Sequence, residues 1–149
     1  MIEKTTTTLT KDEYREKIQS FENTLMECEG ARFGNDACPL KHTFIDGIYT
    51  REIFMEKGLF VSSRIHKTNH PYFILQGDVS VITEEGVVRL QAPHCGITKS
   101  GTKRGLYIHE DTIWVTVHAT NKTSVEEVEK DLVADSFYEL DHEESKVLK

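Results

Sequence analysis

Closely spaced turn signals between residues 42 and 120 limit the fold more than any other feature of this sequence. They are Asp46-Gly47, Lys57-Gly58, Gln76-Gly77, Glu85-Gly86, Ser100-Gly101 and Glu110-Asp111. Between them, β-branched and aromatic residues alternate with polar ones or run in short groups, which is typical of strands. Turns repeated roughly every 8–12 residues indicate an antiparallel sandwich or barrel. The sequence therefore predicts a mainly β fold, with a small antiparallel barrel over residues 40–120.

The two ends of the chain have a helical period instead. Thr10 and Glu13 have the spacing of a capping box, and so do Ser124 and Glu127; an apolar stripe follows each pair. Two explanations of each apolar stripe remain open: it packs on the barrel of its own chain, or it forms an oligomer contact. All these segments are expected in one domain, and they are an N-terminal helix over 10–27, the barrel over 40–120, a C-terminal helix over 124–138 and a frayed tail over 141–149.

Acidic residues are concentrated at the two ends. The net charge of −7 divides into −3 over residues 1–30, +1 over 31–118 and −5 over 119–149. Binding to duplex nucleic acid needs a broad basic surface, which this balance does not provide. No apolar run has the length of a membrane span, and no secretion signal is expected. We therefore expect a protein that works inside a cell, with neither duplex nucleic acid nor a membrane as partner.

Glycines and basic residues recur at fixed intervals in the predicted barrel. The first group is Gly58, Arg64, His66, His70 and Gly77, and the second is Lys99, Gly101 and Arg104. In position, the first group fits the Gly, His, His, Glu and Gly of the first cupin motif. The second group fits the Pro, Gly and His of the second cupin motif. Residues 40–120 therefore resemble the cupin superfamily, which implies an antiparallel jelly-roll barrel.

The residue types depart from the cupin pattern where metal-dependent cupins bind their ion. The resemblance implies that four side chains point into the barrel mouth, and here they are Arg64, His66, His70 and Arg104. A guanidinium stays protonated and has no lone pair for a metal, and two of them repel a divalent cation. We therefore predict a site without a metal or other cofactor. Guanidinium donors match phosphate or carboxylate oxygens, which favours an anionic ligand.

Further basic, hydroxyl and aromatic residues neighbour both motifs. Aromatic rings offer a stacking surface for a base, although strand aromatics in a small barrel more often form its core. Arg51 lies in a predicted strand, where a charge on the next strand is an equally good partner. The candidate ligand-binding residues are Arg64, His66, Lys67, His70, Lys99, Thr102, Lys103, Arg104, Tyr49, Arg51, Tyr107 and His118. No catalytic residue is assigned.

The histidines leave a metal alternative open. His118 ends the last predicted strand, where its side chain reaches either the barrel mouth or solvent. The spacing of His66 and His70 aligns two zinc ligands on a helix, whereas a strand, a loop and a strand are expected here. A metal-dependent cupin enzyme that uses His66, His70 and His118 is therefore the less favoured interpretation.

A second resemblance spans residues 38–135. It is carried by Cys38-Pro39-Leu40-Lys41-His42, Tyr49-Thr50-Arg51-Glu52-Ile53, His66-Lys67-Thr68-Asn69-His70, Gly101-Thr102-Lys103-Arg104, Glu110-Asp111-Thr112-Ile113-Trp114 and His118-Ala119-Thr120. These segments resemble small cupin-like proteins of tailed bacteriophages that are implicated in sequestering cyclic dinucleotides, the signals of CBASS-type defence. The resemblance implies a non-enzymatic sponge for a signal such as cyclic GMP–AMP. It also implies a homo-oligomer, a dimer or tetramer, in the cytoplasm of the infected bacterial host.

Two further alternatives remain. A metal-free sugar-nucleotide epimerase would use His66 or His70 as base and Tyr72 or Tyr107 as acid. No aspartate is evident that would pair with the histidine, because the candidates lie at turns. A phage structural module with an empty, degenerate barrel would need none of these side chains.

Overall fold

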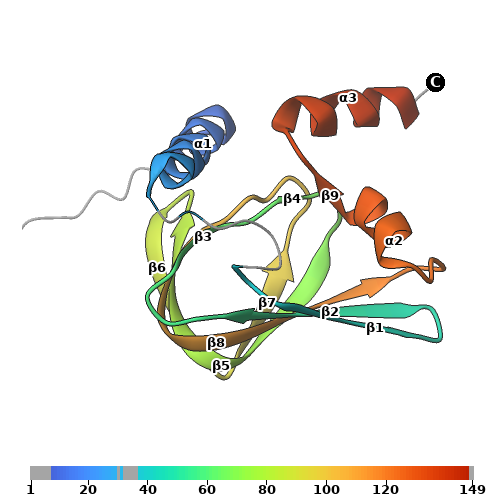
Figure 1. Ribbon diagram of the computed structural model, residues 1–149. Coiled ribbons are helices and arrows are strands. Elements are labelled where there is room, and N and C mark those ends of the chain that lie inside the picture. The colour runs from blue at the N-terminus through green and yellow to red at the C-terminus, as the bar shows by residue number, and fades with distance from the viewer. Residues whose placement is uncertain (1–7, 30, 32–36, 148–149) are drawn as a thin grey trace, which may run out of the picture.

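The computed structural model describes residues 8–29, 31 and 37–147, and side chains up to His142. Three helices and nine strands are assigned in this described part of the chain (Figure 1). In chain order they are α1 (Lys11–Glu27), β1 (Leu40–Ile45), β2 (Ile48–Met55), β3 (Phe60–Ser62), β4 (Ile65–His66), β5 (His70–Thr83), β6 (Gly86–Gln91), β7 (His94–Thr98), β8 (Gly105–Ala119), α2 (Val125–Leu132), β9 (Val133–Ala134) and α3 (Phe137–Val147).

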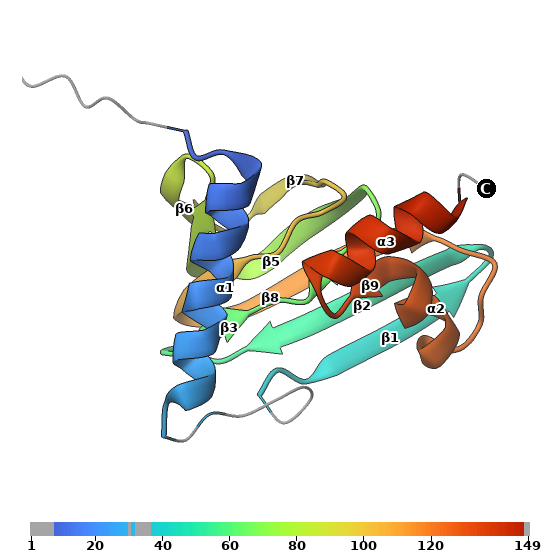
Figure 2. The same ribbon diagram turned by 90° about the horizontal axis from the view of Figure 1, so that it is seen from above.

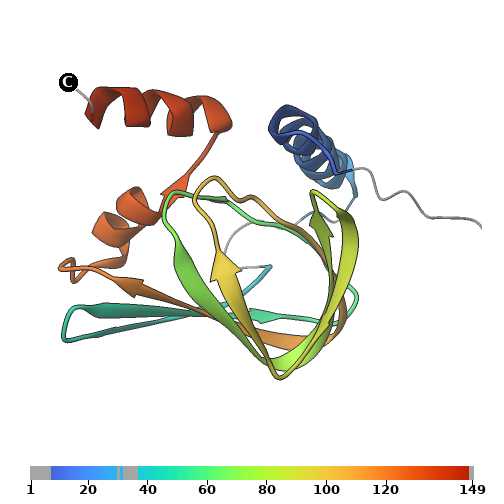
Figure 3. The same ribbon diagram turned by 180° about the vertical axis from the view of Figure 1, so that it is seen from behind.

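Seven of the described strands form one antiparallel sheet. Its order is β1-β2-β8-β5-β6, with β3 also paired to β8 and β7 also paired to β5. The long strands β5 and β8 exchange neighbours along their length, so the sheet curls on itself (Figure 3). The predicted antiparallel β fold with helices at both ends is confirmed. The sheet is curled without closing through hydrogen bonds, since β1 and β6 remain its edges.

The bend in the long strands lies where Gly77 crosses Thr112. The register of β5 against β8 shifts on both sides of Gln76, which marks a bulged and twisted stretch. Gly77 has φ +118°, and a Cβ atom there would lie 2.7 Å from Thr112 Cα. Only glycine allows both the backbone angle and this close approach. The bend separates the half of β5 that pairs with β7 from the half that pairs with β6.

Helix α1 begins as the sequence predicts. The Thr10 side chain accepts a hydrogen bond from the Glu13 N–H, and the Glu13 side chain accepts one from the Thr10 N–H. Tyr14 and Ile18 are buried, so the apolar stripe of α1 packs on its own sheet. Figure 2 shows α1 and α3 lying over the same side of the sheet. Within the described residues, no helix is long and apolar enough to cross a bilayer.

The predicted C-terminal helix over 124–138 is wrong in its extent. It stops at Leu132, because Val133 and Ala134 are buried and pair as β9 with β4. A second capping pair, in which the Ser136 hydroxyl accepts from the Glu139 N–H, then starts α3. The tail expected to fray over 141–149 is therefore helical up to residue 147, and residues 148 and 149 lie outside the described part.

The buried side chains form separate clusters. One fills part of the curled sheet, with Ile74, Val79, Ile108 and Trp114 among its members. Another lies under α2, whose Val128 and Leu132 pack against Tyr49. The stripe of α2 therefore also packs on its own sheet. Because the helices tie down both ends of the chain, the curled sheet keeps an interior space between its walls.

Candidate functional site

A cavity of about 610 Å³ lies inside the curled sheet. This volume falls within the ~300–1,000 Å³ that is usual for small-molecule sites. Most of its lining is apolar, and includes inward-facing residues of β2 and β8 such as Ile53, Met55 and Leu106. The polar residues of the lining are mostly cationic, imidazole and hydroxyl groups, with two carboxylates, Glu22 and Glu29, at the α1 end; the others are Arg51, Ser62, Ser63, Arg64, His66, Arg104, Thr116 and His118. An apolar space with a few cationic and hydroxyl groups suits a ligand that has both rings and charge.

Arg104 is the cation least occupied by other protein groups. Its backbone N–H donates to Ser63 Oγ at 2.8 Å, which fixes the turn just before β8. Its guanidinium carbon lies 5.0 Å from the ring centre of Tyr72 and 5.4 Å from that of Trp114. No carboxylate of the described residues forms an ion pair with it, and burial lowers its pKa. The Arg104 donors are therefore available to an anion in the cavity.

Arg51 supplies a second guanidinium. It lies opposite Thr116 in the pairing of β2 with β8, and its side chain is 15% exposed. One terminal nitrogen is 3.7 Å from a Glu129 carboxylate oxygen, at the outer limit of an ion pair. The Arg51 Nε atom is buried and has no hydrogen-bond partner among the described residues. Arg51 therefore keeps hydrogen-bonding capacity that its protein neighbours do not use.

Arg64 differs from the other two arginines. The resemblance to cupins implies that it points into the mouth, and it does contribute to the cavity lining. Its guanidinium, however, lies 2.8 Å from Asp135 and 3.6 Å from Glu129, and its side chain is 45% exposed. Two carboxylates therefore neutralise it at the rim, where it holds the β9 segment against the sheet.

Three imidazole rings pack together, of which His66 and His118 line the cavity and His70 lies behind them. The ring centres of His66 and His70 are 5.0 Å apart, and those of His70 and His118 are 4.3 Å apart. His70 Nδ1 donates to the Thr68 carbonyl at 3.0 Å, so its Nε2 atom is an acceptor, and it has no partner among the described residues. His118 Nε2 shares a hydrogen bond with the Thr116 hydroxyl at 2.8 Å. The cluster joins β4, β5 and β8.

Burial and neighbouring cations keep these imidazoles neutral. Burial is the largest cause that lowers the pKa of all three, and it brings that of His118 from 6.5 to about 4. Arg104 and Arg51 further lower the pKa of His66, which is therefore within electrostatic reach of both guanidiniums. In the cavity wall, the permanent positive charge belongs to the arginines, and the histidines act as neutral hydrogen-bonding groups.

Several basic and hydroxyl candidates lie away from the cavity. Lys103 is buried and forms an ion pair with Glu22 of α1, so it anchors that helix. Lys67 Nζ donates to the Lys130 carbonyl of α2. Lys99 is exposed. The Thr102 backbone N–H donates to the Lys99 carbonyl, and the Thr102 carbonyl accepts from the His66 N–H, so Thr102 holds the turn that follows Lys99. The convergence of donors expected around Gly101 is therefore not observed.

The two candidate tyrosines also lie elsewhere. Tyr49 is fully buried under α2 and contacts Phe44 and His42. Tyr107 packs its ring against Phe60, at a ring-centre distance of 4.7 Å, and does not line the cavity. Trp114 is a core residue, as expected of a strand aromatic in a small barrel, and it also lines the cavity. The inward alternation of Trp114, Thr116 and His118 along β8 was the signal that would have grouped them.

The residues present do not fit the metal of metal-dependent cupins. Two of the four family positions hold arginines, which cannot coordinate a cation. Across the described residues, no group of three or more His, Cys, Asp or Glu side chains is placed to hold a metal ion. Of the acid candidates for an epimerase, Tyr72 shares a hydrogen bond with His94, and that alternative stays a prediction.

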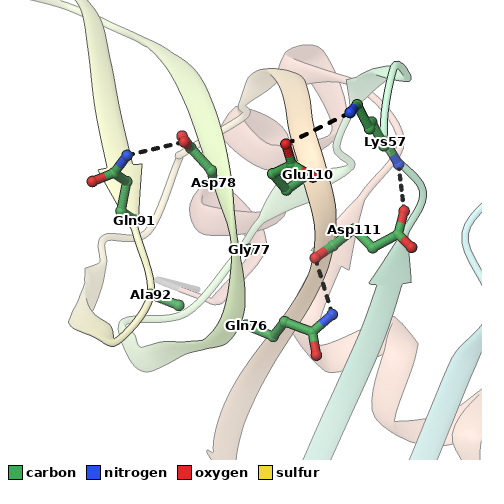
Figure 4. A pocket seen from close by; sticks show the side chains of 8 residues that line it. All are labelled: Lys57, Gln76, Gly77, Asp78, Gln91, Ala92, Glu110 and Asp111. Atoms are coloured by element: carbon green, nitrogen blue, oxygen red, sulfur yellow. Dashed lines mark hydrogen bonds and ion pairs between the residues drawn. The ribbon is translucent and has the colours of Figure 1, made fainter.

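A second, open pocket lies on the outside of the sheet near the bend (Figure 4). Its polar groups pair with one another: Lys57 with Glu110 and Asp111, and Asp78 with Gln91. Hydrogen bonds from Arg89 and Gln91 lower the pKa of Asp78 to about 2. These pairs stabilise the surface of the bend. The inner cavity is therefore the candidate functional site.

Solved structures with little sequence identity overlay on part of this chain. A protein of unknown function from Vibrio parahaemolyticus overlays with a TM-score of 0.50 and 9% identity, over 57% of this chain and 90% of that one. A cupin domain from Bordetella pertussis overlays at 0.45, with 14% identity, over 56% and 94%. The cupin-2 domain of a transcriptional regulator from Enterobacter cloacae overlays at 0.47, with 11% identity, over 58% and 99%.

No protein-family model and no curated protein sequence matches the chain. The predicted fold class is confirmed as a mainly β, antiparallel sheet with helices at both ends. Identities this low concern the fold alone and leave activity and ligand open. None of the three chains is described as a phage protein, so the phage resemblance stays a prediction.

Proposed function

We propose that this protein binds a phosphorylated small molecule in the inner cavity and holds it without chemical change. The observation that carries the proposal is the partly buried guanidinium of Arg104, which lines the cavity without a carboxylate ion-pair partner in the described part of the chain. A buried cation without a counter-ion is costly, and an anionic ligand offsets that cost. Phosphate oxygens match guanidinium donors in paired geometry.

The rest of the lining favours a ligand with rings. Trp114 lines the cavity and stacks on Tyr72 behind it, and both rings lie beside the Arg104 guanidinium. Such a pair keeps the cation in place and limits its freedom before the ligand arrives, which favours tight binding. Apolar side chains such as Met55 and Leu106 cover the remaining wall and suit the flat face of a base. A nucleotide combines both properties.

Within this class, we propose a cyclic dinucleotide, such as cyclic GMP–AMP, as the ligand. Such a molecule carries two phosphates and two bases, so it needs two cationic groups within one site. Arg104 and Arg51 both line the cavity, and both act electrostatically on His66. The resemblance to phage proteins supports the biological role: sequestration of an immune signal in the cytoplasm of an infected host, which blunts anti-phage defence.

The same geometry favours sequestration over catalysis. A general base needs a pKa near the working pH and a partner that orients it. The pKa of His66 is well below its usual value, and the groups acting on it are cations and other imidazoles. No carboxylate orients it among the described residues. A neutral imidazole can still exchange hydrogen bonds with a bound nucleotide, which fits a binding role.

The first test is binding of cyclic dinucleotides, linear nucleotides and sugar nucleotides, screened by thermal shift and measured by calorimetry. Arg104→Ala should weaken binding of the best ligand at least about tenfold, since a hydrogen bond to a charged group contributes ~1.5–3 kcal/mol. Arg89→Ala is the matched control, because it removes the same charge from an exposed pair with Asp78. Its affinity should equal that of the wild type.

Two results would contradict this assignment. One is an unchanged affinity in Arg104→Ala when its thermal midpoint matches that of the wild type. The other is a failure of every nucleotide in the panel to bind. A separate step tests sequestration: the protein is loaded with cyclic GMP–AMP, denatured by heat, and the released ligand is analysed. Intact recovery supports a sponge, whereas a hydrolysed or isomerised product supports an enzyme.

A further inference from the structure

The outside of the curled sheet carries an apolar area that no element of the described chain covers. Along the first half of β5, the inward residues Tyr72 and Ile74 are buried, and the outward residues Phe73 and Leu75 are exposed. Neighbouring strands continue this surface, since Phe73 pairs with Cys95 of β7 and with Val115 of β8. We call it the outer apolar face, and it consists of Phe54, Phe73, Leu75, Ile97, Ile113 and Val115.

The exposure of this face is unusual for a sheet. Antiparallel sheets that meet water commonly alternate apolar residues inward with polar residues outward. The second half of β5 follows that rule, because the outward side chain of Asp78 is paired with Arg89. The first half breaks it, with Leu75 61% exposed and Ile97 of the adjoining strand 69% exposed. Exposed apolar residues also occur singly elsewhere, such as Val87 on β6, but on the outer side of β5, β7 and β8 they adjoin one another across strands.

We propose that the outer apolar face binds a second copy of this chain, forming a symmetric dimer with the two sheets packed face to face. Two curled antiparallel sheets can pack their outer faces in this way, about 10 Å apart. A two-fold axis brings the same surface of both copies together, so one self-complementary face is sufficient.

The distribution of charge favours a second copy on this face over contact through the helices. The two terminal segments carry net charges of −3 and −5, whereas residues 31–118 carry +1. The described helices lie on one side of the sheet, and the outer surface of β2, β8 and β5 lies on the other (Figure 1). Two copies that meet through their sheets therefore keep their acidic helices apart. The helical stripes are already packed inward.

The size of the outer apolar face indicates how tightly two copies should bind. Phe54 and Phe73 are each 38% exposed, Leu75 61% and Ile97 69%. Apolar patches of ~300–600 Å² are the largest on monomeric proteins and are often functional. Residues at the edge of this face, such as the cross-strand pair Lys41 and Glu52, add polar contacts, and a specific interface needs about 1,000 Å² or more in total. A reversible dimer that dissociates on dilution is expected.

Sedimentation velocity over about a hundredfold range of concentration tests the proposal, because a reversible dimer responds to mass action. The wild type should rise from the mass of one chain to that of two. Leu75→Lys and Ile97→Lys should each keep the mass of one chain throughout. Val87→Lys is the matched control: Val87 is 67% exposed on β6, outside the outer apolar face, and this variant should dimerise like the wild type.

Both substitutions replace exposed side chains, so the variants should fold, and their thermal midpoints check this. A wild type that stays at the mass of one chain at every concentration overturns the proposal. So does an oligomer that both variants form as readily as Val87→Lys does. Nucleotide binding is measured on the same samples, and its presence or absence bears on the proposed function without changing either outcome.

Discussion

Acidification should destabilise the folded chain through His118. This imidazole is 6% exposed, and burial, together with the nearby His70 and Arg51, lowers its pKa from 6.5 to about 4. In the unfolded chain the pKa returns to its ordinary value of about 6.5. Between these two values the unfolded chain binds a proton that the folded chain does not bind, so the free energy of unfolding falls as the pH falls. Above pH 6.5 this contribution to instability is absent.

The size of the effect follows from the shift. Each pH unit within the window costs about 1.4 kcal/mol, so His118 alone should lower the free energy of unfolding by about 2 kcal/mol at pH 5. At pH 4 the loss should reach about 3 kcal/mol. His66 and His70 also have lowered pKa values, and they add to the loss in the same direction.

Urea denaturation at pH 7 and pH 5 measures this loss. The variant His118→Asn removes the titrating group and keeps a polar side chain opposite Thr116. Its loss between the two pH values should be about 2 kcal/mol smaller than that of the wild type. Equal losses in His118→Asn and the wild type would refute a buried, neutral His118.

Two further predictions concern the framework. Gly77→Ala should lower the free energy of unfolding by at least about 3 kcal/mol, because strain at positive φ is added to a clash with Thr112. The control Gly86→Ala has a similar φ of +114° and no atom within 4 Å of its Cβ, so it should lose only about 1–2 kcal/mol. Equal losses in the two variants would contradict the clash. Glu22→Gln should lower the free energy of unfolding by about 3 kcal/mol, because it leaves the buried Lys103 without its ion-pair partner. Adding Lys103→Met should restore most of that free energy, and denaturant unfolding of the single and double variants measures both changes.

Local signals predicted the main elements of the fold. The capping box at Thr10 fixed the start of α1, and the glycine turns separated the strands. The C-terminal region was harder, because Val133 continues the apolar stripe of α2 and only its pairing with His66 makes it a strand residue. That pairing joins segments far apart in the sequence, and no local pattern reports it. The Ser136 cap has a recognisable spacing that was available from the sequence.

The site was predicted in part. Motif spacing singled out His66 and Arg104, and both line the cavity. The motif spacing also grouped Lys103 with these two residues. Lys103 is adjacent to Arg104 in sequence, but its side chain forms an ion pair with Glu22 of α1. Adjacent residues of an extended chain face opposite sides, so the position of Arg104 in the cavity itself directs Lys103 away from it. The partner of Lys103, Glu22, lies in a helix more than 80 positions away in the sequence, so local sequence does not predict this contact.

The three arginines show why spacing alone cannot identify the group that holds a ligand. The sequence treats Arg64 and Arg104 as equivalent positions of one pattern, but their carboxylate partners differ. Arg64 has two such partners, Arg51 has one at 3.7 Å, and Arg104 has none among the described residues. Glu129 and Asp135 come from the C-terminal segment, which the cupin pattern does not include. Because each carboxylate already meets the charge of its arginine, the attraction for an anion increases from the Arg64 rim toward Arg104. A phosphate should therefore bind at the Arg104 end of the cavity, against the stacked rings of Tyr72 and Trp114.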